Sequence, residues 1–240
     1  MPDGPGRVAE QGISEVDIRV AESAADRAAV MLLRDIVYVR DQGRLTGSRD
    51  MATTFDKFDS RADYLLAHAG GEPIGAVKII ADSAAGLPCE DVVDIAPLRQ
   101  LDGARLVEFG HLLTVPRARN QSVGMRLMRA ALLHALGTRC ATHIIGDFFI
   151  DDGDRDGGDG EGLRSFYRLI GFTPVGAPYR DTRFKDSPLS LVAVLDLPDA
   201  DRRRATSSGK ERDLLDYFFH DYPERLARGR ARLARRAAGC

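Results

Sequence analysis

A short polar turn between an apolar run and a helical pattern holds the residues with the clearest chemistry. The run Phe109 to Val115 ends at Pro116, and a helical pattern begins near Ser122. Such a turn delivers unpaired backbone N–H groups at the positive end of a helix, which is a ready site for a phosphate. Gly124 would let a ligand approach the backbone closely because it has no Cβ. The sequence therefore predicts a phosphate-binding turn, and the alternative is an ordinary helix start.

Two side chains that could move protons lie on the strand before this turn. Glu108 could act as a general base if partial burial raises its pKa toward neutrality. The alternative is a strand carboxylate paired with an arginine such as Arg105. His111 is three residues further on, and this odd spacing places it on the opposite face of a regular strand. A β-bulge could bring both groups to one cleft, and otherwise His111 is a satisfied buried histidine.

Composition narrows the classes of function. The chain has 240 residues and 44% hydrophobic residues, enough for one α/β domain with a sizeable core. The net charge of −2 and the pI of about 6.2 make nucleic acid an unexpected partner. The three cysteines, Cys89, Cys140 and Cys240, form no C-x-x-C pair, which argues against a disulfide framework or a zinc site. We expect a cytoplasmic protein without a signal peptide or a membrane span.

Apolar periodicity and turn residues predict the order of elements. Ser23 should cap the first helix and Gly43 should end it. Gly70 and Gly71 should join two strands as a hairpin. We expect strands at 16–20, 62–67, 73–80, 105–115, 142–150, 172–175 and 189–197, with helices at 23–42, 121–136 and 163–170. The predicted fold is α/β (α+β), with a mixed, mostly antiparallel seven-stranded sheet flanked by helices.

Segments outside this pattern are predicted as follows. Residues 1–14 should be a flexible tail, 15–198 the main domain and 199–240 an Arg-rich helical extension. The acidic segment Asp151 to Gly162 resembles half of a calcium loop, but Leu163 stands where that loop needs Glu, so we expect a solvated loop and no metal. A polar linker is expected at 201–209. One or two helices should follow at 210–238, and they would pack on their own domain or contact an acidic partner such as a carrier protein.

Two motifs resemble the GNAT superfamily of acyltransferases. Gln121, Gly124 and Arg126 have the spacing of its acyl-CoA signature, Q/R-x-x-G-x-G/A, with Arg126 in place of Gly or Ala. The segment Phe166 to Phe172 resembles the F-Y-x-x-x-G-F segment that ends the fourth helix of these enzymes. The resemblance implies a GNAT-like sheet and an acyl-thioester co-substrate, without a tightly bound cofactor.

Residues 30 to 175 resemble more closely the acyl-homoserine-lactone synthases and N-acyl amino acid synthases. The segment Asp56 to Asp59 is similar to their D-x-x-D motif, and Lys78 stands where their next strand has Arg. Glu108 is similar to the first residue of their E-x-x-R motif, but His111 replaces its Arg. That change makes homoserine lactone synthesis from S-adenosylmethionine less expected than acylation of another amine.

This resemblance implies an N-acyltransferase that moves an acyl group from an acyl-CoA or acyl-carrier-protein thioester to the amine of a small metabolite or amino acid. The alternatives are an acetyl-CoA-dependent acetyltransferase and a non-catalytic GNAT-fold module that binds acyl thioesters. The amine, the acyl length, the choice between CoA and carrier protein and the oligomeric state stay open.

The implied site residues fall into three groups. The catalytic group is Glu108 as base, His111 as base or substrate contact, and Tyr167 as acid for the leaving thiolate. The acceptor contacts are Arg34, Asp56, Asp59 and Lys78. The donor contacts are Leu113, Val115, Arg119, Asn120, Gln121, Ser122, Val123, Gly124, Met125 and Arg126.

Overall fold

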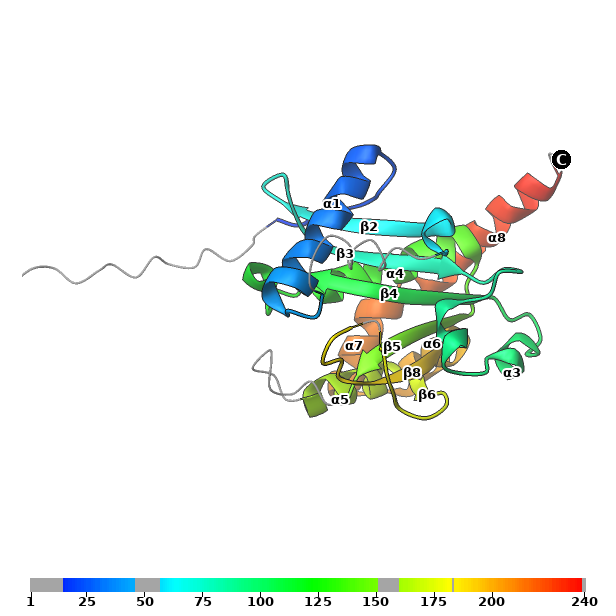
Figure 1. The fold of residues 1–240 in the computed structure, drawn as a ribbon. Helices are drawn as coiled ribbons and strands as arrows, with labels where there is room; N and C mark the ends of the chain where they lie inside the picture. Colours follow the sequence, from blue (N-terminus) through cyan, green and yellow to red (C-terminus); the bar gives the residue numbers. More distant parts are fainter. Residues whose placement is uncertain (1–14, 46–56, 151–159, 183, 239–240) are drawn as a thin grey trace, which may run out of the picture.

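One mixed sheet forms the scaffold of the molecule. The computed structural model describes residues 15–45, 57–150, 160–182 and 184–238. The strand order is β1-β2-β3-β4-β5-β8-β6, with β7 also pairing with β8 (Figure 1). Within these residues every neighbouring pair is antiparallel except β4 and β5, which are parallel. The strands are β1 Asp17–Val20, β2 Ala62–Ala69, β3 Glu72–Ala81, β4 Leu106–Thr114, β5 His143–Phe149, β6 Thr173–Pro174, β7 Tyr179–Arg180 and β8 Leu189–Asp196.

The predicted fold class is confirmed, and the sheet has one short strand beyond the seven expected. The added strand, β7, is two residues long, too short for its sequence to show an alternating pattern. The predicted β2–β3 hairpin is confirmed: Gly70 and Gly71 have positive φ angles of 57° and 84°, which glycine adopts without strain.

The first helix changes its hydrogen-bond pattern part-way. Helix α1, Ala24–Arg34, begins at Ser23, whose Oγ accepts from the Asp26 N–H at 3.1 Å while Asp26 accepts from the Ser23 N–H at 2.9 Å. This reciprocal capping box confirms the predicted start. The chain continues as a π-helix, η1, Asp35–Asp41, and Gly43 follows with a φ angle of 61°. The expected length is thus correct, and the π-helical second half is an addition.

Between the hairpin and the central strand the chain makes an excursion that contains two short helical segments. They are the 3-10 turn η3 (Pro88–Asp91) and the short helix α3 (Ala96–Arg99), both between β3 and β4. Another 3-10 turn, η2 (Asp59–Arg61), lies earlier in the chain, just before β2. Leu87, Ile95 and Ile145 belong to a second, smaller core cluster beneath this excursion. The cluster fixes η3 against β4. As a result the backbone N–H of Cys89 in η3 is held beside Glu108 of β4.

Helices cover both faces of the sheet. Helix α1 crosses one face, and α4, Val123–Arg139, lies on the other together with α7, Gly209–Phe219, and α8, Tyr222–Ala238 (Figure 1). Helix α4 follows the 3-10 turn η4, Pro116–Ala118. It buries a stripe formed by Val123, Leu127, Ala131 and Ala135. The strand, turn and helix order on which the phosphate-site prediction depends is therefore present.

Three helices follow β8, and one more helix precedes β6 in the described chain. Helix α5 is Gly160–Ile170, and α6 Leu197–Thr206, α7 Gly209–Phe219 and α8 Tyr222–Ala238 follow β8. The predicted polar linker at 201–209 is wrong. The Asp196 side chain caps α6 by accepting from the Asp199 N–H at 2.8 Å, and Arg204 pairs with Asp201 at 3.1 Å, so charged residues that suggested a linker stabilise a helix instead.

The last two helices, α7 and α8, pack on the same core as the sheet. This agrees with the expectation that they pack on their own domain. Phe218 and Phe219 of α7 are buried in the main cluster. Gly229 of α8 lies so close to α4 that an added Cβ would be 2.5 Å from the Leu136 carbonyl oxygen.

Some predictions fall outside the described residues. These are the tail at 1–14, Asp56 and the acidic residues 151–159. Of the helices that the structure describes, none is both long enough and apolar enough to cross a bilayer.

Candidate active site

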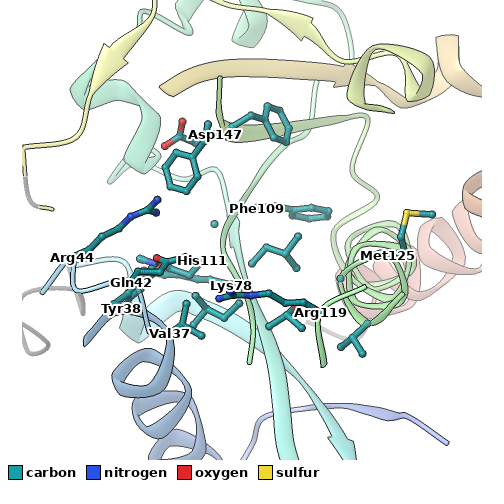
Figure 2. A pocket seen from close by; sticks show the side chains of 18 of the residues that line it. Val37, Tyr38, Gln42, Arg44, Lys78, Phe109, His111, Arg119, Met125 and Asp147 are labelled. Carbon is teal, nitrogen blue, oxygen red and sulfur yellow. The ribbon is translucent and has the colours of Figure 1, made fainter. Parts of the chain in front are cut away.

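The main cavity opens where β4 and β5 part. The two strands pair from Leu106 with His143 to Phe109 with Gly146, and within the described chain their pairing ends there. A cavity of about 680 Å³ follows, between the second halves of β4 and β5. Its walls come from η1, β3, β4, β5 and the start of α4 (Figure 2).

A β-bulge in β4 places alternate residues on the cavity face. His111 and Leu112 of β4 stand opposite one residue of β3, and His111 has a positive φ angle of 47°. Residues 76, 78 and 80 of β3 share one face, so their β4 partners share it too: Leu113, Gly110 and Glu108. His111 lines the same cavity as Glu108. The β-bulge that would bring Glu108 and His111 to one cleft is therefore present.

Glu108 is a buried carboxylate on the cavity wall. Its side chain is 6% exposed, and its Oε2 accepts a hydrogen bond of 2.9 Å from the backbone N–H of Cys89 in η3. Burial raises the pKa of Glu108 to about 7, and the carboxylate of Asp147 adds to this, while the Cys89 hydrogen bonds and Lys78 oppose it. Among the described residues, Glu108 forms no ion pair with Arg105, which was the alternative. Glu108 can therefore gain or lose a proton near neutral pH.

His111 is held by a residue from the π-helix. Its Nδ1 and the Tyr38 hydroxyl share a hydrogen bond of 2.8 Å, and the two rings meet edge to face with centroids 5.9 Å apart. Tyr38 is buried and also contacts Phe184 at 5.1 Å between centroids. Two irregular backbone segments, η1 and the β4 bulge, thus meet through this one hydrogen bond.

Tyr167 of α5 lines the cavity within an aromatic cluster. Its ring centroid is 3.8 Å from that of Phe148, 5.3 Å from that of Phe166 and 5.6 Å from that of Phe172. Burial raises the pKa of the Tyr167 phenol well above its usual value. The phenol therefore stays protonated at neutral pH and can donate a hydrogen bond.

The start of α4 forms the other end of the cavity. Ser122 precedes the helix with a φ angle of 61°, and its side chain makes no capping hydrogen bond. Val123, Gly124 and Met125, whose N–H groups have no acceptor within an α-helix, all line the cavity. This is the geometry of an anion site at a helix N-terminus.

A buried ionic cluster stands behind the cavity wall. Lys78 lines the cavity with a 1% exposed side chain, and its Nζ is 3.3 Å from Asp59. Arg34 lies 3.7 Å from the same carboxylate and donates to the Tyr64 hydroxyl at 2.6 Å. Tyr64 in turn donates to Asp59. The cluster fixes Lys78 at the cavity from the side of α1.

A smaller, apolar cavity adjoins the first. It measures about 70 Å³ and shares with the larger one the residues around the strand split, including Phe109, Phe148 and Tyr167. Its remaining walls are Val77, Met128, Ile144, Gly146 and Phe172. Because Met128 belongs to α4, the recess leads from the split toward the α4 face of the sheet.

Comparison with known protein families matches residues 29–148, half of the chain, to the model of FeeM, an N-acyl amino acid synthase. The chain belongs to the FeeM family. It is a GNAT-type N-acyltransferase that uses acyl thioester donors. Among curated proteins no match was found.

Solved structures share the fold of this FeeM-family chain. The structure of FeeM, from uncultured soil microbes, has a TM-score of 0.59 and 21% identity over 78% of this chain and 94% of that one. A putative N-acetyltransferase from Lactobacillus plantarum has a TM-score of 0.53 and 20% identity, over 76% and 99%. An acyl-CoA N-acyltransferase from Pseudomonas aeruginosa has 0.51 and 18%, over 75% and 99%. At these identities the likeness establishes the GNAT fold.

The structure brings together most of the donor contacts predicted for this FeeM-family chain. Those that line the main cavity are Leu113, Arg119, Asn120, Ser122, Val123, Gly124 and Met125. Arg119 also pairs with Asp41 at the end of η1.

Three predicted donor contacts lie away from the cavity. Val115 uses both backbone groups inside the fold, since its N–H donates to Ile74 at 3.0 Å and its carbonyl accepts from Ala118 at 2.9 Å. The Gln121 side chain donates to the Arg117 carbonyl at 2.8 Å, which shapes the turn. The Arg126 side chain is exposed one residue beyond the cavity-lining stretch.

Of the predicted acceptor contacts in this FeeM-family chain, some line the cavity and others lie behind its wall. Lys78 lines the cavity, whereas Arg34 and Asp59 are buried behind it and hold Lys78 in place. Asp56 lies outside the described residues.

Several polar residues of the cavity were missed by sequence reasoning, among them Asp147, Tyr38 and Arg44. Asp147 accepts from the Tyr179 hydroxyl at 2.5 Å, and as an acid in the apolar strand HIIGDFF it carried a signal that was overlooked. Tyr38 stands four residues after Arg34, on the same side of the first helix, which also could have indicated it. Arg44 follows the helix-ending Gly43 in a loop, where no periodicity could predict its direction.

Proposed function

We propose that this enzyme transfers an acyl group from a phosphopantetheine thioester to the α-amino group of a free amino acid, with Glu108 as the general base. The observation that carries the proposal is a buried carboxylate with a pKa of about 7 beside a strand split that leads to an uncapped helix N-terminus. A base with this pKa is suited to take a proton from an ammonium group near neutral pH.

The donor would lie between the start of α4 and the strand split. Its phosphate would accept from the N–H groups of residues 123–125, and the pantetheine arm would follow β4 past Leu113. The first carbons of the acyl chain would enter the apolar cavity beside Tyr167. CoA and an acyl carrier protein both present this phosphopantetheine group, so the proposal holds for either donor.

The reaction balances as follows. Glu108 takes one proton from the substrate ammonium, and the freed amine attacks the thioester carbonyl carbon. A C–N bond forms, the C–S bond breaks, and its electron pair leaves on the sulfur. The nitrogen loses its second proton as the amide forms. The thiolate takes up one of the two protons and the other reaches solvent.

Tyr167 is better suited to hydrogen-bond the leaving sulfur than to give it a proton. A phenol whose pKa is raised by burial is a weaker acid than an ordinary thiol, whose pKa is about 8.5. Protonated Glu108, with a pKa of about 7, is acidic enough to return a proton to the thiolate. The proposal therefore assigns the leaving-group proton to Glu108 or water.

Thermal unfolding with a panel of thioesters tests the donor site. The panel is acetyl-CoA, a long-chain acyl-CoA, free CoA and an acylated carrier protein, because a ligand that binds only the native state raises the unfolding midpoint. A ligand at 100 times its Kd adds about 2.7 kcal/mol, which is roughly 5 °C or more for a chain of this size. The best donor is then supplied with each of the twenty amino acids, and the product is detected by mass.

Each outcome has a separate meaning. Stabilisation that grows with acyl length, followed by an N-acyl amino acid product, supports the proposal. Preference for acetyl-CoA favours an ordinary acetyltransferase. The absence of any shift would show that the start of α4 is not a phosphate site.

A matched pair of glycine variants locates the donor. A Cβ at Gly124 would meet only the Thr114 hydroxyl, at 3.8 Å, so Gly124→Ala fits the fold but fills space on the ligand side. We expect it to keep its unligated midpoint and to lose most of the ligand-induced shift. Gly137→Ala, on the same helix with no atom within 4 Å of the added Cβ, should keep the full shift.

A further inference from the structure

The Glu108 carboxyl lies in an apolar part of the sheet. Its register partners are Ile80 of β3 and Ile145 of β5, which are buried and carry no polar side-chain atom. Within the described chain, the hydrogen bonds that this carboxyl accepts come from Cys89 of η3. A residue outside the sheet therefore supplies the polar contacts of the proposed base.

Cys89 offers the Glu108 carboxyl two donors, one from its backbone and one from its side chain. The backbone N–H donates to Oε2 at 2.9 Å, and the thiol also hydrogen-bonds to the carboxyl. Burial, with the charge of Glu108 added, holds the pKa of the Cys89 thiol well above its usual range. The thiol therefore keeps its proton at neutral pH and stays a neutral donor.

The place of Cys89 in η3 is fixed, and it lies behind the cavity wall. Its carbonyl accepts from the N–H groups of Val92 and Val93 at 3.0 and 2.9 Å, so both of its backbone groups are used. Its side chain is buried in the second core cluster. The neighbouring Pro88 lines the main cavity, whereas Cys89 does not. Cys89 can thus contact the base without contacting the substrate.

A network of charges fastens η3 to the end of β3. Glu90 of this turn accepts from the Leu87 N–H at 2.6 Å and pairs with Arg99 of α3 at 2.6 Å. Arg99 also pairs with Asp82, which follows β3, at 2.7 Å. On the other side, Leu87 is buried in the second core cluster. The turn is held from both sides, so Cys89 keeps its position beside Glu108.

We propose that Cys89 is a positioning residue of the reaction, whose N–H and thiol orient the Glu108 carboxyl and favour its ionised form. This inference rests on the proposed function, in which Glu108 is the general base, because only the ionised form can take a proton from the substrate ammonium. Hydrogen bonds that a carboxylate accepts stabilise its charge, and they are stronger inside a protein than in water. Without them, the apolar surroundings would leave more of the carboxyl protonated at neutral pH.

Other charged groups near Glu108 act less strongly than Cys89 and in opposite directions. Asp147 of β5 raises the pKa of Glu108 and Lys78 of β3 lowers it, and each has a smaller effect than either Cys89 hydrogen bond. Because the two strongest interactions that lower this pKa come from Cys89, a change of its side chain should move the pKa in a known direction. The remaining titratable groups of the main cavity are Tyr38, Arg44, His111, Arg119, Tyr167 and Asp181.

Two substitutions of Cys89 should move the pH dependence in opposite directions. In the wild-type enzyme we expect the midpoint of the kcat/KM profile at about pH 7. Cys89→Ala removes the thiol and keeps the N–H, so this midpoint should rise by about 0.5 to 1 pH unit. The rate should then fall about two- to fivefold at pH 7 and stay within about twofold of wild type at pH 9. Cys89→Ser offers a hydroxyl, which is a stronger donor than a thiol, and should lower the midpoint.

A measurement without turnover checks the same effect. Difference infrared spectroscopy follows the protonated carboxyl of Glu108 as the pH changes, and Glu108→Gln is the reference that lacks it. The infrared midpoint should shift in each Cys89 variant as the kinetic midpoint does. Cys140→Ala, at the other buried cysteine of the described chain, is the matched control and should leave both midpoints unchanged. If Cys89→Ala does not fold, Cys89→Ser, which is close to cysteine in size, still tests the downward shift.

Two results would overturn the role of Cys89. One is that the infrared and kinetic midpoints of its variants stay within about 0.2 pH unit of wild type. The other is an equal loss of rate at every pH, which would show that Cys89 only supports the fold. By contrast, a Glu108→Gln variant that keeps the full rate and its pH dependence would overturn the proposed base itself, so the two failures are distinguishable.

Discussion

Burial raises the pKa values of Glu108 and Tyr167, and these two changes have opposite consequences for catalysis. The pKa of Glu108 rises from about 4.5 to about 7, which turns a weak base into a usable one near neutral pH. The pKa of Tyr167 rises too, and this makes the phenol a poorer acid while keeping it a hydrogen-bond donor. The same physical cause therefore assigns different roles to a carboxyl and a phenol.

Glu108→Gln is the most direct test at this scale. Glutamine keeps an oxygen that can accept from the Cys89 N–H, so the fold should remain while the base is lost. We expect kcat to fall by about 10²- to 10⁴-fold. In the wild-type enzyme kcat/KM should rise with pH through about 7, as Glu108 ionises, and the remaining activity of the variant should lack this step. Steady-state rates between pH 5.5 and 9 would check both, and a variant within about threefold of wild type would contradict the role.

The same carboxyl predicts a pH dependence of stability. Because the folded pKa is raised, the native state keeps a proton between about pH 4.5 and 7 that the unfolded state has lost. The stabilisation from this proton is complete below pH 4.5 and disappears as pH rises through 7. Relative to Glu108→Gln, the wild-type protein should therefore lose up to about 3 kcal/mol of unfolding free energy over this range. Urea unfolding of both proteins at pH 5 and pH 8 measures the difference, and an equal pH dependence would show that Glu108 is not buried in this way.

Sequence reasoning could predict the residues of β4 better than those of the loops. The odd spacing of Glu108 and His111 showed that a regular strand would separate them, so a bulge followed as the condition for a shared cleft. No such rule reaches Arg44, because a side chain in a loop has no period from which its direction follows. The buried position of Arg34 also could not be predicted, since it depends on Tyr64 and Asp59 converging from a different part of the chain.

At the scale of elements, irregular segments carry the polar side of the cavity. Tyr38 lies in the π-helix η1 and His111 in the β4 bulge, and each irregularity turns its side chain toward the other. Apolar periodicity predicted the length of the first helix, but it does not distinguish α from π hydrogen bonding over two turns. Such segments are more common at functional sites than elsewhere, which agrees with where they occur here.

The apolar cavity predicts how α4 limits the acyl chain. Met128 forms one of its walls, and the volume of about 70 Å³ leaves space for roughly two water-sized groups. Met128→Trp should fill this recess and shift donor preference toward acetyl or other short thioesters, while Met128→Ala should favour longer ones. Competition between two acyl donors of different length in one reaction measures the shift. An unchanged ratio in both variants would place the acyl chain elsewhere.

For the whole molecule, the C-terminal helices are part of the core rather than an appended tail. The linker prediction failed because a polar composition was taken for flexibility, although α6 has a capped start and several of its charges are paired. Phe218 and Phe219 of α7 pack in the same cluster as α4, so the expectation that this segment packs on its own domain is met. The order of strands and helices was predictable because each has its own period or cap, whereas the docking partner of each helix is a tertiary property.

Gly229 gives a test of this docking. Its added Cβ would be 2.5 Å from the Leu136 carbonyl oxygen and 3.1 Å from the Cys140 sulfur, so Gly229→Ala must push α8 away from α4. We expect a loss of about 1–3 kcal/mol in unfolding free energy, with little change in kcat/KM below the unfolding range. Gly137→Ala is the matched control, because its Cβ meets no atom within 4 Å and alanine is the better helix former. Chemical unfolding of both variants measures the loss of stability. Equal midpoints would show that α8 is not closely packed against α4.

The bulge in β4 makes the number of residues in this strand as important as their identity. Deleting either His111 or Leu112 would restore a regular ladder with β3 and would leave Glu108 and Leu113 on one face, because each would keep its β3 partner. The one residue left opposite Val77 would then point to the other face of the sheet, so a histidine there would be separated from Glu108 and from the Tyr38 hydroxyl. A chain that keeps the contact between Tyr38 and His111 can exchange many side chains of β4, but it cannot lose the extra residue of the bulge.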